Sequence, residues 1–301
     1  MPNIYQNIGS NKRSTVVIMI LFVVVITLIA WFIGNFFYDG NGTYFLGYAL
    51  VFSGLSGLFS YYTSDSLVLA ISNAKEVTER EAPDLHNLVE NMCIASGISK
   101  PKVYIINDSS MNAFATGRDP KHSSICFTTG IVQRLEKREL EGVVAHEMSH
   151  IGNFDTRLMC IVSVLVGSVS LLSNWMTRGF FFRGRRKSSN AGGELGGILF
   201  LAGLVLLILS PLISTLIKLA LSRKREYLAD ATAALITRYP IGLANALRKI
   251  SQDTEILEAA NSATAHMYIA DPVRGKIKSS TANLFDTHPP IEERIKRLES
   301  M

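Results

Sequence analysis

Two long stretches without a charged residue lie near the start of the sequence and limit how it can fold. The first runs from 14 to 38 and the second from 40 to 64. Each exceeds the roughly 20 residues that a helix needs to cross the apolar core of a bilayer. The link between them, 39–42, reads Asp-Gly-Asn-Gly and is typical of a turn. The pattern predicts a membrane hairpin whose spanning helices cover about 15–37 and 44–62.

The first stretch is preceded by Lys12 and Arg13, as the apolar part of a signal peptide is. However, its apolar part, 16–37, is too long for a cleavable signal, so we expect a retained helix. The whole chain is 48% hydrophobic and only 18% charged, which is typical of a membrane protein. Its net charge of +5 comes from basic residues beside the apolar runs, where they meet anionic lipid. We therefore expect a lipid bilayer as a partner and no nucleic acid.

Two further uncharged runs, Leu158–Thr177 and Leu195–Ile217, are also long enough to span a membrane. A pair of core helices in a large domain is the alternative interpretation. The loop between the runs carries five basic residues, although such charges favour the cytoplasmic side. The burial of two long apolar helices outweighs that bias, so the prediction is four spanning helices rather than a shallow second hairpin.

The segment between the two pairs of apolar runs has the pattern of a globular domain. Residues 81–97 predict a helix that begins near Pro83, ends at Gly97 and has one apolar face. Short β patterns follow at 103–106, 112–117 and 124–129, which predicts a small β meander. The three cysteines, Cys93, Cys126 and Cys160, stand far apart and are expected to be buried apolar residues.

Directly after these strands the sequence reads AHEMSH, with His146, Glu147 and His150 in the H-E-x-x-H pattern. The flanking apolar residues have helical spacing, and positions four apart lie on one face of a helix, so both imidazoles reach one ion. Glu147 then lies beside the ion and is free to take a proton from water. The pattern indicates a zinc site with a general base.

Catalytic zinc normally has three protein ligands, so a third one is needed. The metzincin extension requires Gly at 153 and His at 156, but Asn153 and Thr156 stand there. The best candidate is Glu226, because Asp230 follows four residues later on the same helix face. We expect Glu226 to bind the metal and Asp230 to accept the outer N–H of a ligand histidine.

Four segments together resemble the HtpX heat-shock membrane metalloproteases, which are relatives of the type I CAAX prenyl proteases. They are NAFATG, AHEMSHIGNFD, SRKREYLADA and LFDTHPPIEERIKRL, in this order along the chain. The resemblance implies a zinc endopeptidase of the bacterial inner membrane, with one Zn²⁺ per chain. It implies that misfolded or damaged membrane and cytosolic proteins are the substrates, in membrane-protein quality control under stress. It also implies that the protein is multi-pass, with the catalytic domain and both termini facing the cytoplasm.

Carried over residue by residue, the resemblance implies that His146, His150 and Glu226 bind the metal and that Glu147 is the base. His288 and Arg294 match a His and an Arg that the prenyl protease relatives hold near the catalytic centre. The residues alone leave His288 open as an ordinary turn residue. Asp155 and Asp230 match acidic positions of the family.

The predicted fold is a mostly α integral membrane protein with a small β meander and a gluzincin-like metalloprotease domain on transmembrane helices. Its predicted parts are a membrane hairpin at 1–64, the first half of the catalytic domain at 65–157, a second hairpin at 158–220 (helices at about 158–177 and 196–217), and the second half of the catalytic domain at 221–301.

Other functions compete with this interpretation. Intramembrane proteases of the site-2 kind hold H-E-x-x-H inside a spanning helix, but charged residues at 136–141 place this helix in water. A transporter or metal-binding scaffold would not need Glu147. For a protease, an exposed strand edge holds the peptide extended, and we expect that edge at 112–117 rather than an internal strand there. The predicted contacts are Asn112, Ala113, Phe114, Ala115 and Thr116.

Overall fold

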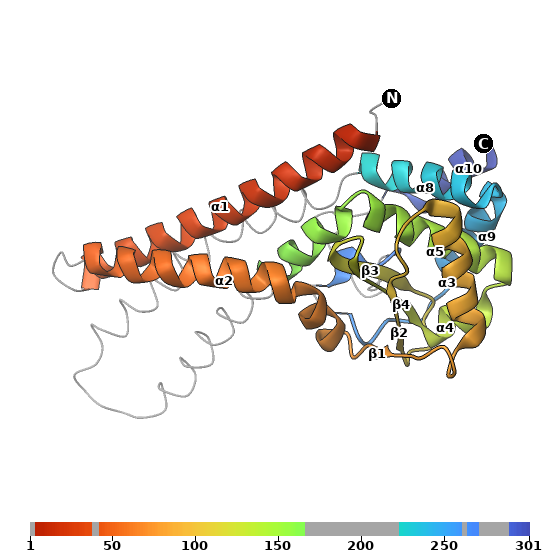
Figure 1. Cartoon of the computed structure of the whole chain (residues 1–301), viewed down its shortest axis with the longest axis horizontal. Helices are drawn as coiled ribbons and strands as arrows, with labels where there is room; N and C mark the ends of the chain where they lie inside the picture. Colours follow the sequence, from red (N-terminus) through yellow and green to blue (C-terminus); the bar gives the residue numbers. More distant parts are fainter. Residues whose placement is uncertain (1–3, 38–41, 166–222, 261–263, 271–288) are drawn as a thin grey trace.

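The computed structural model describes residues 4–37, 42–165, 223–260, 264–270 and 289–301. Two long helices, α1 (Ile4–Phe37) and α2 (Gly42–Ile71), run side by side and project from a globular part (Figure 1). The predicted first hairpin lies within these two helices. The predicted second hairpin covers 158–220, and its part from residue 166 onward lies outside the described residues.

The projecting helices expose large apolar side chains to their surroundings. Among the described helices, one stretch, Ile8–Leu28 of α1, has the length and composition to cross a membrane. On α2, exposed apolar residues include Leu50, Phe52, Leu55 and Phe59. So many exposed apolar side chains are unfavourable in water and match a lipid environment.

The sheet contains β1 (Lys75–Glu76), β2 (Lys102–Ile106), β3 (Ala113–Asp119) and β4 (His122–Thr128), in the order β1-β2-β4-β3. The predicted meander is therefore wrong. Strands β3 and β4 form an antiparallel hairpin, but β4, not β3, lies beside β2, and these two are parallel.

Strand β4 takes the place beside β2 because the 107–112 link passes across the end of β4. The Thr128 hydroxyl donates to the Ser110 carbonyl oxygen at 2.6 Å, and the Gly130 N–H donates to the Asp108 carbonyl oxygen at 2.9 Å. A Cβ on Gly130 would lie 2.0 Å from the Ser109 carbonyl oxygen, so only glycine fits beneath the link. The crossing puts β3 at the edge of the sheet.

The helices of the globular part pack around α5 (Lys137–Gly152), which contains the H-E-x-x-H pattern. It begins with a capping box between Glu136 and Glu139 and is buried along most of its length. It packs against β3 and against the helices α3, α8 and α9 (Figure 1). The bounds of the other helices are α3 (Pro83–Ser96), α4 (Thr129–Arg134), α8 (Arg223–Thr237), α9 (Pro240–Gln252) and α10 (Ile291–Glu299), with a 3₁₀ turn η1 (Ala265–Met267).

Two further predictions are confirmed. Helix α3 begins at Pro83, ends at Gly97 in the left-handed conformation with φ 71°, and buries the predicted apolar face. The three cysteines are free and buried. Leu85, Leu88 and Val89 on that face join the same core cluster as Val143, Val144 and Met148 of α5. The core thus fixes α5 from both sides, and with it the side chains described next.

Candidate metal centre

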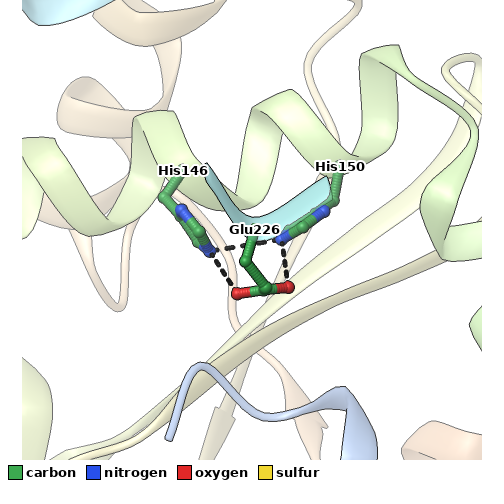
Figure 2. A group of neighbouring side chains, drawn as sticks. All are labelled: His146, His150 and Glu226. Carbon is green, nitrogen blue, oxygen red and sulfur yellow. Dashed lines mark hydrogen bonds and ion pairs between the residues drawn. The ribbon is translucent and has the colours of Figure 1, made fainter. Parts of the chain in front are cut away.

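His146 and His150 project from one face of α5 into the interior of the globular part. They stand four residues apart, so their rings lie one turn from each other, with the Nε2 atoms 3.2 Å apart (Figure 2). The exposed fractions are 1% for His146 and 4% for His150. The predicted convergence of the two imidazoles is present.

Glu226 reaches the same point from the first turn of α8. One carboxylate oxygen lies 3.7 Å from His146 Nε2 and the other lies 3.5 Å from His150 Nε2 (Figure 2). One ligand atom from each of the three residues lies within 4.8 Å of the others. Two imidazole nitrogens and one carboxylate form the donor set typical of catalytic zinc.

The outer nitrogens of both rings are held by buried carboxylates. His146 Nδ1 donates to Asp230 at 3.0 Å, and His150 Nδ1 donates to Asp155 at 3.0 Å. A neutral imidazole carries one N–H, so with Nδ1 as the donor each Nε2 offers a lone pair. Two lone pairs and a carboxylate that face one another repel unless a cation lies between them. The donor set therefore fits a metal ion, and both acidic positions have the geometry of outer partners.

The charge of the cluster leads to the same conclusion. Glu147, Asp155, Glu226 and Asp230 are at most 2% exposed. Among the described residues, the guanidinium groups of Arg225 and Arg294 approach them. Burial alone would lower the pKa of His150, but its bond to Asp155 and the charges of Glu226, Asp155 and Glu147 raise it to about 9. The cluster thus favours a positive charge at His150, and a divalent cation would supply that charge in place of the proton.

Glu147 follows His146 on α5 and lies toward the strand β3. Burial raises the pKa of its carboxyl group to about 7, with the charge of Glu226 acting in the same direction. The backbone N–H of Ala115 in β3 is near enough to this carboxylate to oppose part of the rise in its pKa. A carboxylate held in this way beside a metal centre, with a pKa near neutrality, is suited to accept and return a proton.

Arg294, predicted as catalytic, lies against Glu226 and Asp230 with no exposed surface. Its Nε and Nη2 atoms donate to the two oxygens of Asp230 at 2.8 and 2.7 Å, and its Nη1 lies 3.4 Å from Glu226. Burial tends to raise the pKa of the Asp230 carboxyl, but the charge of Arg294 and its hydrogen bonds keep that pKa below its usual value. The guanidinium thus links α10 to Asp230 and to Glu226, both on α8.

His288 lies outside the described residues, so its predicted place near the centre stays a prediction. No sequence pattern pointed to Asn11 of α1 or to a role for Arg225, and the structure brings both to Asp155. A polar side chain next to a long apolar run was the only available signal for Asn11.

The predicted substrate contacts on β3 have partners within the chain. The Asn112 side chain donates to the Ala270 carbonyl oxygen at 3.0 Å, and the Ala113 carbonyl oxygen accepts from the Ile269 N–H at 2.9 Å. The Phe114 ring packs against Tyr268, and the Thr116 hydroxyl lies 2.8 Å from the Cys160 sulfur. Of the five predicted contacts, Ala115 is the one whose backbone lies near Glu147.

Comparison with known proteins identifies the family. The profile of Peptidase family M48 matches residues 79–301. The chain belongs to peptidase family M48. It is 42% identical over 297 residues to a "Protease HtpX homolog" of Dictyoglomus thermophilum, with 99% of this chain and 94% of that protein covered. A "Protease HtpX homolog" of Ligilactobacillus salivarius is 44% identical over 303 residues, with coverage of 99% and 100%.

Among solved structures, the crystal structure of S. mikatae Ste24p shares the fold, with a TM-score of 0.51 at 19% identity. The alignment covers 91% of this chain and 62% of that one. The predicted family is confirmed by these matches. The chain is a membrane-associated metalloprotease that acts on polypeptides.

The structure makes Arg294 a stabilising element of the centre. Replacing it by methionine leaves the buried Asp230 without its cationic partner and with only the His146 contact, and loss of one member of a buried ion pair costs about 3–5 kcal/mol. We expect the Arg294→Met variant to lose that much free energy of unfolding and to bind metal more weakly. Denaturant unfolding of the metal-free protein measures the first effect, and chelator competition measures the second.

Arg297→Met is the matched control on the same helix. Arg297 pairs with Glu293 at 2.7 Å, with about half of each side chain exposed, and lies 3.7 Å from the centroid of the Tyr227 ring, so its loss should cost no more than about 2 kcal/mol. Equal losses of stability in the two variants would contradict the role assigned to Arg294.

Proposed function

We propose that the protein is a zinc endopeptidase in which His146, His150 and Glu226 hold one Zn²⁺ per chain. The observation that carries this proposal is the convergence of both Nε2 atoms and the Glu226 carboxylate, with the outer nitrogens of both rings held by Asp230 and Asp155. Neutral nitrogen and carboxylate oxygen ligands suit Zn²⁺. When bound, the ion supplies Lewis acidity, which polarises a carbonyl group and lowers the pKa of water.

The remaining steps belong to the residues of the chain. Glu147 takes a proton from the attacking water, and its carboxylic acid then gives that proton to the amine that leaves when the peptide bond breaks. Asp155 and Asp230 keep the protons of the ligand histidines on Nδ1 and so keep Nε2 available. Arg294 holds Asp230 in the required orientation. His288 is proposed to bind the developing oxyanion.

We infer that an extended peptide binds along β3, with main-chain hydrogen bonds to its outer edge. Supporting this, β3 is the terminal strand of the sheet and packs against α5. Because Ile269 and Ala270 already pair with Ala113 and Asn112, the proposed contact is narrowed to the edge at Ala115, beside Glu147. Recognition through the main chain suits unfolded segments, such as those of misfolded or damaged membrane and cytosolic proteins.

The proposed location is the bacterial inner membrane, with several spanning helices and with the catalytic domain and both termini in the cytoplasm. The exposed apolar surfaces of α1 and α2 support insertion of the first hairpin. An intramembrane site is not supported, because α5 lies in the globular part and its first turns carry the exposed residues Lys137 and Arg138.

The assignment of the base is tested by Glu147→Gln in the purified full-length protein. The amide cannot accept the proton, so casein degradation should fall by about 10²–10⁴-fold. Zinc content should stay at one per chain, because the three ligands are intact. Glu226→Gln is the matched comparison and should lose zinc itself, since a carboxylate ligand is removed. Loss of zinc in Glu147→Gln, or full activity in it, would overturn the assignment, and so would activity that survives a chelator.

The edge at Ala115 is tested from the substrate side, because Ala115→Pro would also remove the N–H that contacts Glu147. A peptide substrate is compared with a series in which one amide at a time is replaced by an ester, which removes one N–H donor. The ester that lies opposite Ala115 should lower kcat/KM by about 2- to 10-fold, the worth of one hydrogen bond. Esters farther from the cleaved bond are the control. A series without any position-dependent loss would contradict binding by strand addition.

The second hairpin is tested by labelling. A single cysteine at Ser188, in a chain whose three native cysteines are replaced by alanine, lies in the predicted loop between the two runs. If both runs span, a membrane-impermeant thiol reagent added outside intact spheroplasts should label it. Labelling that requires lysis would mean that the loop stays in the cytoplasm and that four spanning helices are wrong.

A further inference from the structure

The N-terminal part of α1 extends beyond the uncharged run and reaches the metal centre from outside. Asn11 in this part is 4% exposed. Its Nδ2 donates to Asp155 Oδ1 at 2.6 Å and to the Asn153 carbonyl oxygen at 2.9 Å. Its Oδ1 accepts from Arg225 at 3.0 Å. The amide group is thus bonded through both its nitrogen and its oxygen in the interior of the protein.

These contacts place Asn11 one step from a metal ligand. Asp155 uses Oδ2 to accept the proton of His150 Nδ1 and uses Oδ1 to accept from Asn11. With both oxygens bonded, the plane of the carboxylate is fixed, and with it the direction of the His150 ring. An outer partner that orients a ligand histidine in this way contributes to metal affinity.

Asn11 also contacts the other segment that carries a ligand. Arg225 immediately precedes Glu226 in the first turn of α8, and its Nε lies 3.6 Å from Asp155. One amide group therefore joins α1, the turn after α5 and the start of α8. Asn11 lies outside residues 79–301, which match the peptidase family.

We propose that Asn11 is a positioning residue of the metal centre, which acts through Asp155 on His150 and through Arg225 on the segment that carries Glu226. The proposal rests on the metal-ligand assignment made above. The alternative is that Asn11 only anchors α1 to the globular part. Other residues of α1 already do that: Lys12 lies 4.3 Å above the Phe154 ring, and Ile18 packs with Leu158 and Val162.

The test uses full-length protein in detergent with three substitutions. Asn11→Asp keeps the size of the side chain but replaces the donor by a second carboxylate against Asp155. Asn11→Ala removes the amide without adding charge. Lys12→Ala is the matched control, because it weakens the same helix contact without touching Asp155. For each, the Zn²⁺ dissociation constant is measured by chelator competition, the geometry by the visible absorption spectrum of Co²⁺ at the site, and the stability by thermal unfolding of the metal-free protein.

We expect Zn²⁺ affinity to fall by about 10- to 100-fold in Asn11→Asp, and less in Asn11→Ala, in line with the loss of an outer partner of a ligand. The Co²⁺ spectrum should shift in both, whereas Lys12→Ala should keep the wild-type affinity and spectrum. If Asn11 only anchors α1 to the globular part, all three variants should have a lower unfolding temperature and an unchanged Zn²⁺ affinity and Co²⁺ spectrum. That outcome would overturn the proposal, and so would an equal loss of affinity in Lys12→Ala.

His150→Ala separates this proposal from the one on which it rests. If His150→Ala keeps wild-type Zn²⁺ affinity, the ligand assignment is wrong and the role of Asn11 falls with it. If His150→Ala loses the ion while both Asn11 variants bind it normally, only the role of Asn11 is wrong.

Discussion

The structure depends on the compensation of negative charge in its interior. Four carboxylates, those of Glu147, Asp155, Glu226 and Asp230, are withdrawn from water, and an unpaired buried carboxylate costs several kcal/mol. Their partners come from segments that lie far apart in the sequence: the imidazoles of His146 and His150 from α5, the guanidinium groups from α8 and α10, and an amide from α1. Apolar packing brings these segments together, and the hydrogen bonds and ion pairs that each makes with the buried carboxylates set its orientation.

This dependence explains how much of the fold and the site could be predicted from the sequence. The spacing of His146 and His150 is a property of one helix, so their convergence followed from local geometry. Glu226 was found because Asp230 lies one helical turn away from it. The order of the sheet was mispredicted, because alternation identifies a strand and not its neighbour, and the link over Gly130 decides the pairing. The contact of Asn11 with Asp155 left no local pattern, because it joins residues from distant parts of the chain.

Helix α1 has two environments, and this shapes how the membrane part and the catalytic domain are joined. Its uncharged run exposes apolar residues such as Val17, Ile20 and Val24, which favour lipid. The turn before that run carries Asn11 and Lys12, which contact the domain through polar and cation–π interactions. The polar contacts hold only at one register and rotation of the helix, because the amide must meet Asp155 and Arg225 together. Under the proposed function, insertion of α1 into the membrane and assembly of the metal centre would therefore constrain each other.

The edge of β3 limits how the domain can hold a peptide under the proposed function. Alternate residues of the strand point their backbone groups away from β4, and the protein itself uses two of these positions. The Ala113 carbonyl oxygen accepts from Ile269, and the Gly117 N–H donates to the Cys160 sulfur at 3.4 Å. Between them lies Ala115, next to Glu147. A peptide that adds to this edge gains few main-chain hydrogen bonds, each worth about 0.5–1.5 kcal/mol. Binding through the main chain at so short an edge selects only weakly among substrate sequences. The substrate must also be locally unfolded, because its backbone groups have to be free to pair there.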